Sequence, residues 1–294
     1  MKWNQKSHAK DWLLFADNIG PYLSIDETSL ANGELYTILT NKAAKGKQGS
    51  IVAIVAGTQA ETIIDIIQKI PERKRKEVKE ITLDMAASME LIARKCFPMA
   101  DLVTDRFHVQ RLALDAVQDM RIKLRWEAID AENEGYEKAK ENKTKYEPEI
   151  LSNGDTMKQL LARGRYVLYK QPGDWTQRQK KRAELLFMHY PDLKKAYDLS
   201  CDLRRIYEST DKRIFGFTRL AKWYEKVRQS GFKVFNTVAR SLENHYATIA
   251  NYFLKRSTNA SAESFNAKIK AFRSQFRGVK SIEFFLYRLT KLYA

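Results

Sequence analysis

The 294-residue sequence is poor in cysteine and has no long apolar run. Its two cysteines, Cys96 and Cys201, stand far apart and outside any CxxC pattern. This argues against a disulfide framework and a cysteine zinc site, and fits a reducing cytoplasm. No apolar run reaches the roughly 18 residues that a transmembrane helix needs. The opening stretch, "MKWNQKSHAKDWLLF", has no apolar signal region and no small-residue cleavage site. We therefore expect a soluble cytoplasmic protein with no membrane partner.

Acidic residues are also scarce relative to basic ones. The chain has 52 Lys and Arg against 36 Asp and Glu, a net charge of +16. Such a surplus favours an acidic polymer as partner, with nucleic acid ahead of an anionic membrane surface. Apolar residues make up 44% of the chain, which is enough for a large core and excludes global disorder. The length allows one large domain or two modest ones.

The N-terminal third shows strand patterns. Residues 21–30, "PYLSIDETSL", are typical of a strand. Two β-branched runs follow at 35–39 and 50–56, around a turn rich in lysine and glycine, which predicts a hairpin. The first three strands should therefore be antiparallel.

Helices and strands then alternate. The segment "TQAETIIDIIQKIP" has helical spacing, with a capping-box pattern at Thr58 and Glu61 and a stop at Pro71. The segment "ITLDMAAS" (81–88) predicts a short strand that ends in Asp84. The helix "SMELIARKCFP" follows, and 100–109 predicts another strand. The expected order is β-β-β-α-β-α-β.

From about residue 110 to 254 the chain has helical periodicity and little strand signal, with breaks at Pro191 and Gly231. The last stretch again predicts a patterned helix. One of its faces is apolar and another is polar and mostly cationic. The apolar stripe consists of Phe265, Ile269, Phe272 and Phe276. The second face carries Glu263, Asn266, Lys270, Arg273 and Arg277.

Three carboxylates suggest a metal site. Asp26 lies near the end of the first strand and Asp84 at the end of the fourth, so the two meet if those strands are neighbours. Carboxylates held so close repel each other unless a cation lies between them. Glu263, on a packed helix, would be a third ligand, and oxygen ligands suit Mg²⁺ or Mn²⁺. The alternative is that each aspartate is an ordinary turn or cap residue.

Three segments carry a family resemblance: "IDETSL"; "TLDMAASM" followed by "CFPMADLVTDRFHVQRLALDAVQDMR"; and "STNASAESFNAKIKAFRSQFRGVKSIEFFLYRL". Together they resemble the DDE transposases of bacterial insertion sequences, of the ISL-three type. The resemblance implies an α/β, ribonuclease H-like mixed sheet interrupted by a large all-α insertion. It implies four parts: an N-terminal extension (1–18), the first part of the catalytic core (19–112), the helical insertion (113–254) and the final core helices (255–294).

The resemblance also implies a function. It assigns catalysis and metal binding to Asp26, Asp84 and Glu263, with two Mg²⁺ (or Mn²⁺) ions. The expected reaction cleaves phosphodiesters at transposon ends and transfers the 3′-OH strand to target DNA. The expected partners are DNA and a second copy of the chain on it, in the bacterial cytoplasm with the nucleoid.

Further residues have expected roles around this site. Asp105 is either a fourth acid beside the metals or, in our preferred interpretation, a supporting residue that orients the strand end or pairs with Arg106. We expect His108 to be packed or hydrogen-bonded in support of the site, and not to act as a general base. The residues expected to contact DNA are Asn266, Lys268, Lys270, Arg273 and Arg277.

Related transposases carry a zinc-binding and helix-turn-helix region before the catalytic domain, and the residues before Asp26 hold no such pattern. We therefore expect either a separate end-recognition polypeptide or a truncated element. Other functions also remain open. The chain could be a structure-selective DNA nuclease of the same fold, or a non-catalytic, domesticated DNA-binding transposase. It could also be a helical nucleic-acid-binding protein in which the three acids do not converge.

Overall fold

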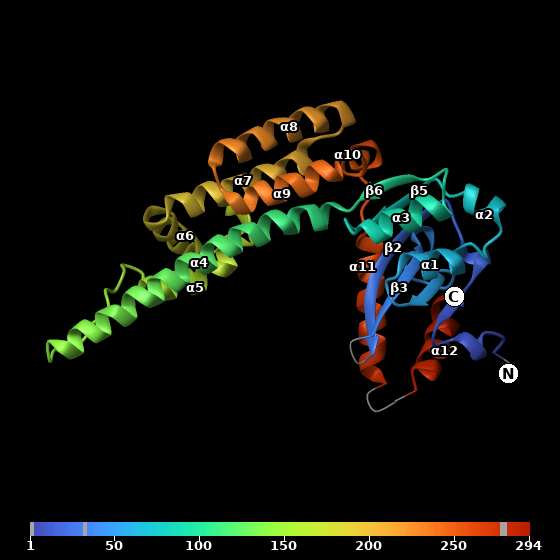
Figure 1. The fold of residues 1–294 in the computed structure, drawn as a ribbon, viewed down its shortest axis with the longest axis horizontal. Coiled ribbons are helices and arrows are strands. Elements are labelled where there is room, and N and C mark those ends of the chain that lie inside the picture. Colours follow the sequence, from blue (N-terminus) through green and yellow to red (C-terminus); the bar gives the residue numbers. More distant parts are fainter. Residues whose placement is uncertain (1–2, 32–33, 277–280) are drawn as a thin grey trace. The chain divides into compact units, whose positions relative to one another are not determined.

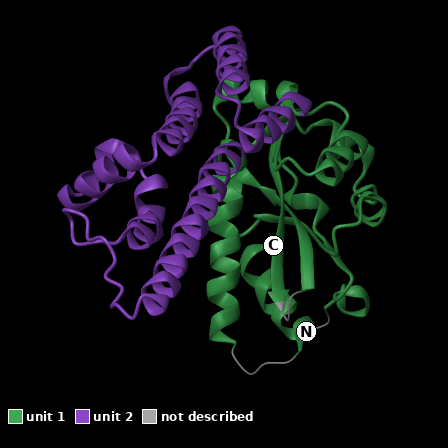
Figure 2. Ribbon diagram, turned by 60° about the vertical axis from the view of Figure 1, so that its left-hand side comes forward, with its two compact units in different colours: residues 1–108, 245–294 green, residues 109–244 purple. Residues whose placement is uncertain are grey.

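The structure, a computed structural model, describes residues 3–31, 34–276 and 281–294. The chain divides into two compact units (Figure 2). The first combines residues 1–108 with 245–294, and the second contains residues 109–244. In the described part of the chain, no helix combines the length and apolar character needed to cross a membrane.

A mixed sheet of six strands forms the centre of the first unit (Figure 1). Its order is β1-β4-β3-β2-β5-β6. The pairs β1–β4, β4–β3 and β3–β2 are antiparallel, whereas β2–β5 and β5–β6 are parallel. The strands are β1 (Trp12–Leu14), β2 (Tyr22–Ala31), β3 (Glu34–Asn41), β4 (Ile51–Ala56), β5 (Glu80–Leu83) and β6 (Asp101–Thr104). This topology confirms the ribonuclease H-like class and the three consecutive antiparallel strands.

Helices cover both faces of the sheet (Figure 1). Those of this unit are α1 (Ala60–Ile67), α2 (Glu72–Lys76), α3 (Ala87–Cys96), α10 (Tyr246–Lys255), α11 (Ala260–Gln275) and α12 (Ile282–Tyr293). On one face, α1 and α3 pack against Leu23, Ile25 and Leu39. On the other, α11 and α12 pack against Ile38 and Ile54. Because β4 is covered on both sides, five of its six residues are buried and its sequence, IVAIVA, is apolar throughout.

The apolar stripe predicted on α11 is confirmed. Phe265 and Ile269 are fully buried, and Phe272 and Phe276 are partly buried against the same core. The helix α10 packs on β6 at the edge of the sheet. There Asn251 donates to the backbone oxygen of Leu102 at 2.8 Å, and the hydroxyls of Thr104 and Thr248 lie 2.7 Å apart. These contacts satisfy polar groups that an edge strand would otherwise expose.

Three local predictions were wrong. The N-cap of α1 is Gln59 and makes no side-chain cap bond, so the expected box of Thr58 and Glu61 does not form. The predicted strand over 100–109 ends at Thr104, because the chain enters α4 at Arg106. Asp26 lies in the middle of β2, which continues to Ala31 because β3 pairs with it along its length. The short edge strand β1 was not predicted, since three residues are too few for a periodic pattern.

The second unit is helical. Its helices are α4 (Arg106–Glu141, which begins in the first unit), α5 (Met157–Leu168), α6 (Gln177–His189), α7 (Pro191–Ser209), α8 (Arg213–Ser230) and α9 (Lys233–Asn244). The breaks predicted at Pro191 and Gly231 are both present. Gly231 has a φ of 70°, the left-handed conformation that favours glycine after a helix. Short 3-10 helices occur in the first unit at Lys6–His8, Ala16–Asn18 and Lys42–Ala44, and in the second unit at Pro172–Asp174.

Candidate metal-binding active site

The register of the parallel strands aligns three aspartates. Tyr22 of β2, Glu80 of β5 and Asp101 of β6 lie in one row of the sheet. Side chains in one row of a sheet point to the same face, and so do those an even number of residues further along. The residues four positions after that row are Asp26, Asp84 and Asp105. The strands therefore bring these aspartates to neighbouring positions, although 79 residues (105 − 26) separate the first from the last in the sequence.

Asp26 is held by two hydrogen bonds. Its Oδ1 accepts the backbone N–H of Glu27 at 2.9 Å, and its Oδ2 accepts the side-chain amide of Asn266, on α11, at 2.7 Å. Burial raises the pKa of Asp26, and the Asp84 and Asp105 carboxylates raise it further, while the Glu27 bond and His108 act in the opposite direction. The carboxyl thus has a fixed orientation, and its ionised form is penalised.

Asp84 follows β5 directly and is half-buried. Its Oδ1 accepts the backbone N–H of Ala86 at 2.9 Å, just before α3 begins. The neighbouring Glu27 is also half-buried. Its pKa is raised by burial and by the charges of Asp84 and Asp26. Electrostatic repulsion therefore extends across this end of the sheet.

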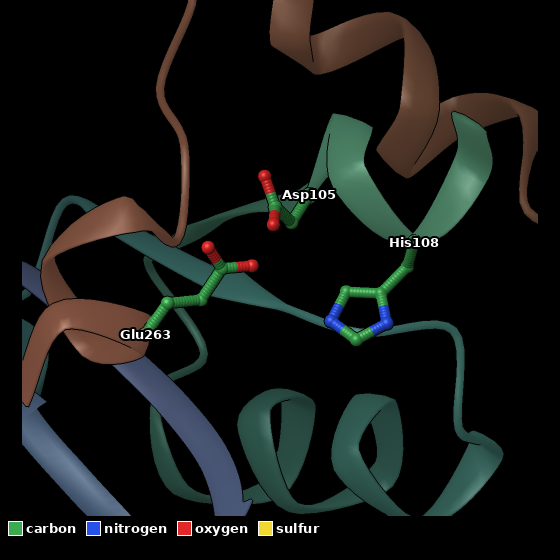
Figure 3. A group of neighbouring side chains, drawn as sticks. All are labelled: Asp105, His108 and Glu263. Atoms are coloured by element: carbon green, nitrogen blue, oxygen red, sulfur yellow. The ribbon is translucent and has the colours of Figure 1, made fainter. Parts of the chain in front are cut away.

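Asp105, His108 and Glu263 form the tightest group (Figure 3). Each offers one ligand atom, and these atoms all lie within 4.8 Å of one another. Asp105 and His108 come from the β6–α4 junction, and Glu263 comes from the first turn of α11. Figure 3 shows the two carboxylates turned toward each other with the imidazole beside them. Burial raises the pKa of Glu263, as do Asp105 and Asp26, whereas His108 lowers it.

This donor set fits a divalent cation. Asp105 is 1% exposed, and among the described residues its Oδ2 has no hydrogen-bond partner. Burying an unpaired carboxylate oxygen is costly, so such an atom calls for a cation or a donor. Arg106, the partner we considered for Asp105, instead donates to the Tyr252 hydroxyl at 3.4 Å. The residues that could hold metal are therefore Asp26, Asp84, Asp105, His108 and Glu263.

The residues expected to contact DNA lie in different settings on α11. Asn266 is buried, at 8% exposure, and donates to Asp26. Lys268 donates to the backbone oxygen of Gly46 at 3.1 Å, and Arg273 lies over the ring of Phe285. Lys270 is exposed. Arg277 lies outside the described residues. For each, DNA contact stays a prediction.

Two residues predicted to support the site lie beside one of its predicted catalytic acids. Asp105 and His108 each place a possible ligand atom within 4.8 Å of one on Glu263. A usable signal was their separation of three residues, which places two side chains on one side of a helical turn. The role of Asn266 as a donor to Asp26 had no signal in the sequence, because 240 residues separate the pair.

Comparison with known proteins shows the family of the chain. The family model of the ISL3-type DDE transposases, described as "Transposase", matches residues 23–289. The transposase for insertion sequence element IS1001 of Bordetella parapertussis is 22% identical over 270 residues. That alignment covers 91% of this chain and 60% of the relative, so the chain spans about 60% of the relative's length. No solved structure matches the chain significantly. Since the family model covers most of the sequence, the chain belongs to the ISL3-type family of DDE transposases.

Proposed function

We propose that the chain is the catalytic part of a transposase, which cleaves phosphodiesters at transposon ends and joins the freed 3′-OH to target DNA. The observation that carries the proposal is the alignment of Asp26 on β2 with Asp84 and Asp105, which directly follow β5 and β6, and the position of Glu263 beside Asp105. Among the described residues, no lysine or arginine forms an ion pair with these acids, in contrast to the buried Asp155. Family membership supports the same reaction.

In this proposal the acids have distinct tasks. Asp26, Asp84 and Glu263 hold divalent cations, two Mg²⁺ or Mn²⁺ in the full site. Such ions, when bound, activate the attacking oxygen and stabilise the leaving oxygen of a phosphodiester. Asn266 fixes the direction of the Asp26 carboxylate. In the first step water attacks and the bond from phosphorus to the 3′ oxygen breaks. In the second step that 3′-OH attacks a target phosphodiester, whose own 3′-OH leaves.

DNA is the proposed partner, bound mainly through its phosphates. On α11, Lys270 is exposed, which suits a phosphate ligand. In the second unit, basic side chains surround a surface hollow between α7 and α8. They are Arg205, Arg219, Lys222 and Lys226, with Asp202 among them. Binding through such residues should weaken steeply with salt.

Two further features belong to the proposal. Two copies act together, because a transposon has two ends. The protein works at the bacterial nucleoid, in the cytoplasm.

The test is strand transfer by the full chain on labelled DNA that carries the terminal repeats flanking its gene, with Mg²⁺ or Mn²⁺. A pre-cleaved end with an exposed 3′-OH removes the need for the first cut. The variant is Asp84→Asn, and the matched control is Asp101→Asn, an exposed aspartate at the opposite end of β6. We expect metal-dependent joining that falls at least about 1,000-fold in Asp84→Asn and persists in the control.

Other outcomes select the rival functions. Cleavage of branched DNA without joining would identify a structure-selective nuclease. DNA binding without chemistry, equal in wild type and Asp84→Asn and unchanged by neighbouring gene products, would identify a non-catalytic DNA-binding protein.

A further inference from the structure

The group formed by Asp105, His108 and Glu263 contains a nitrogen ligand, which the three-carboxylate assignment lacks. We propose that His108 is a direct metal ligand, so that this group binds Mn²⁺ in preference to Mg²⁺. The proposal deepens the function proposed above, since it concerns the metal of the same site. It can fail or succeed independently, because metal binding is measured without DNA.

Geometry is the first support. The three ligand atoms lie within 4.8 Å of one another, as the atoms around a single ion do. Asp105 and His108 are separated by about one helical turn, so they can reach the same ion from one element. Glu263 approaches from α11, which is packed against β2 by the buried side chains Phe265 and Ile269. Two packed elements therefore hold the group together.

The second support is the state of Asp105. Its side chain is 1% exposed, and its Oδ2 has no hydrogen-bond partner in the described part of the chain. The charged groups that face it through α11 and β2 include the carboxylates of Glu263 and Asp26, which add repulsion. A bound cation supplies the missing partner and offsets this repulsion.

An alternative is that His108 is protonated and pairs with the two acids. That arrangement should produce a hydrogen bond or a close ion pair from the imidazole. Among the described residues, His108 makes neither; its ring lies edge-on to the ring of Phe107, with centroids 5.7 Å apart. An imidazole that faces two carboxylates without bonding to them is what an ion between the three groups requires.

The donor set decides which ion is favoured. Mg²⁺ binds almost entirely through oxygen and keeps much of its water. Imidazole nitrogen suits transition metals, and Mn²⁺ is the transition metal of the two ions expected at this site. Carboxylates are good ligands for Mn²⁺ as well. A site of two carboxylates and one imidazole should therefore discriminate against Mg²⁺, although the three aspartates and Glu263 alone would accept either ion.

The experiment is electron paramagnetic resonance of the full, DNA-free chain titrated with Mn²⁺, including a pulsed measurement of coupling to nitrogen. We expect wild type to show one bound Mn²⁺ with a nitrogen coupling. In His108→Gln the coupling should disappear, and the Kd for Mn²⁺ should rise about 10-fold. Mg²⁺ should compete with Mn²⁺ less well in wild type than in the variant.

Two further variants sharpen the result. His189→Gln, a substitution on α6 in the second unit, is the matched control and should leave the coupling intact. Asp105→Asn should weaken Mn²⁺ binding and keep the nitrogen coupling. Circular dichroism checks that each variant is folded. The proposal is overturned if wild type lacks the coupling, or if the coupling survives in His108→Gln. Strand transfer in that case would leave the proposed function standing with an all-carboxylate site.

Discussion

Two aspartates, one in each compact unit, are equally buried and have opposite surroundings. Asp155, just before α5, is 1% exposed, and both its oxygens are paired. Arg163 donates to Oδ1, while Arg182 at 3.0 Å and Asn153 at 2.9 Å donate to Oδ2. Asp105 is also 1% exposed, but its Oδ2 is unpaired and other acids lie around it.

The pKa shifts follow this difference. Burial alone would raise the pKa of Asp155, but the hydrogen bonds and charges of Arg182 and Arg163 outweigh it and lower the pKa. In the acidic group of the first unit, burial raises the pKa values of Asp26 and Glu263, and the neighbouring carboxylates add to the increase. Removing one partner of a buried ion pair is costly, because it leaves the other charge uncompensated, whereas a group of uncompensated acids is typical of a binding site. Substitutions at Asp155 and in the acidic group of the first unit should therefore differ in their effect on stability.

The largest effect on stability is expected at Asp155. Asp155→Asn removes the charge and leaves Arg163 and Arg182 without their counter-ion, which should lower the free energy of unfolding by about 3 kcal/mol. Urea unfolding measures the change. The control is Asp192→Asn, an exposed residue paired with Lys195 on α7, which should cost less than about 0.5 kcal/mol. Equal stability of wild type and Asp155→Asn would contradict a structural role for this network.

The substitution Asp105→Asn should weaken metal binding without lowering stability, in contrast to the substitution at Asp155. Without metal, the variant should be as stable as wild type or more stable, because it removes a buried charge that repels its neighbours. Mn²⁺ affinity should fall about 10–100-fold, measured by calorimetric titration. Asp101→Asn, on the same strand and exposed, is the control. A marked loss of stability with unchanged metal affinity would mean that Asp105, like Asp155, has a structural role and does not bind metal.

A substitution of Asn266 tests whether the Asp26 carboxylate must be held in one orientation. Asn266→Ala removes the donor to Asp26, so the rate of strand transfer should fall about 10-fold. A hydrogen bond to a carboxylate favours its charged form, so its loss should raise the pKa of Asp26 and move the acid limb of the pH–rate profile to higher pH. Lys268→Ala, which removes a bond to Gly46 instead, should leave the limb in place. If the strand-transfer rate of Asn266→Ala fell but the acid limb of its pH–rate profile did not move, Asn266 would have a packing role only.

The smallest effect is expected for Glu263→Gln in the absence of metal. The pKa of Glu263 is raised in the folded state, so ionisation costs stability as the pH rises from the ordinary glutamate range to the raised value. The variant escapes this loss. Its Tm should match wild type at low pH and exceed it by about 1–2 °C above that window, a small gain because Glu263 is partly solvent-exposed. Thermal unfolding over a pH series measures the difference in Tm between the variant and wild type. A higher Tm of the variant at low pH only would contradict the predicted pH dependence and the repulsion between the acids.

Much of the fold could be predicted from local patterns, and the family from the three segments that resemble it. The β-branched runs at Leu35–Leu39 and Ser50–Ala56 predicted the hairpin, and the spacing of Phe265 and Ile269 predicted the buried face of α11. These patterns depend on neighbours a few residues away, which a sequence displays directly. The strand end at Thr104 was missed because "DRFHV" has an apolar pattern compatible with a strand, while tertiary packing starts a helix there.

The sequence by itself determined which residues are acidic, where most of the strands and helices lie, and which face of α11 is apolar. Only the tertiary structure decided that β2, β5 and β6 are parallel neighbours in a register that aligns Asp26, Asp84 and Asp105. It also decided that Asn266 holds Asp26, and that Asp105 is buried with an unpaired oxygen beside His108 and Glu263. The physical reason is that register and burial arise from contacts between segments up to 240 residues apart. No short pattern specifies such contacts, because they depend on how the whole core packs.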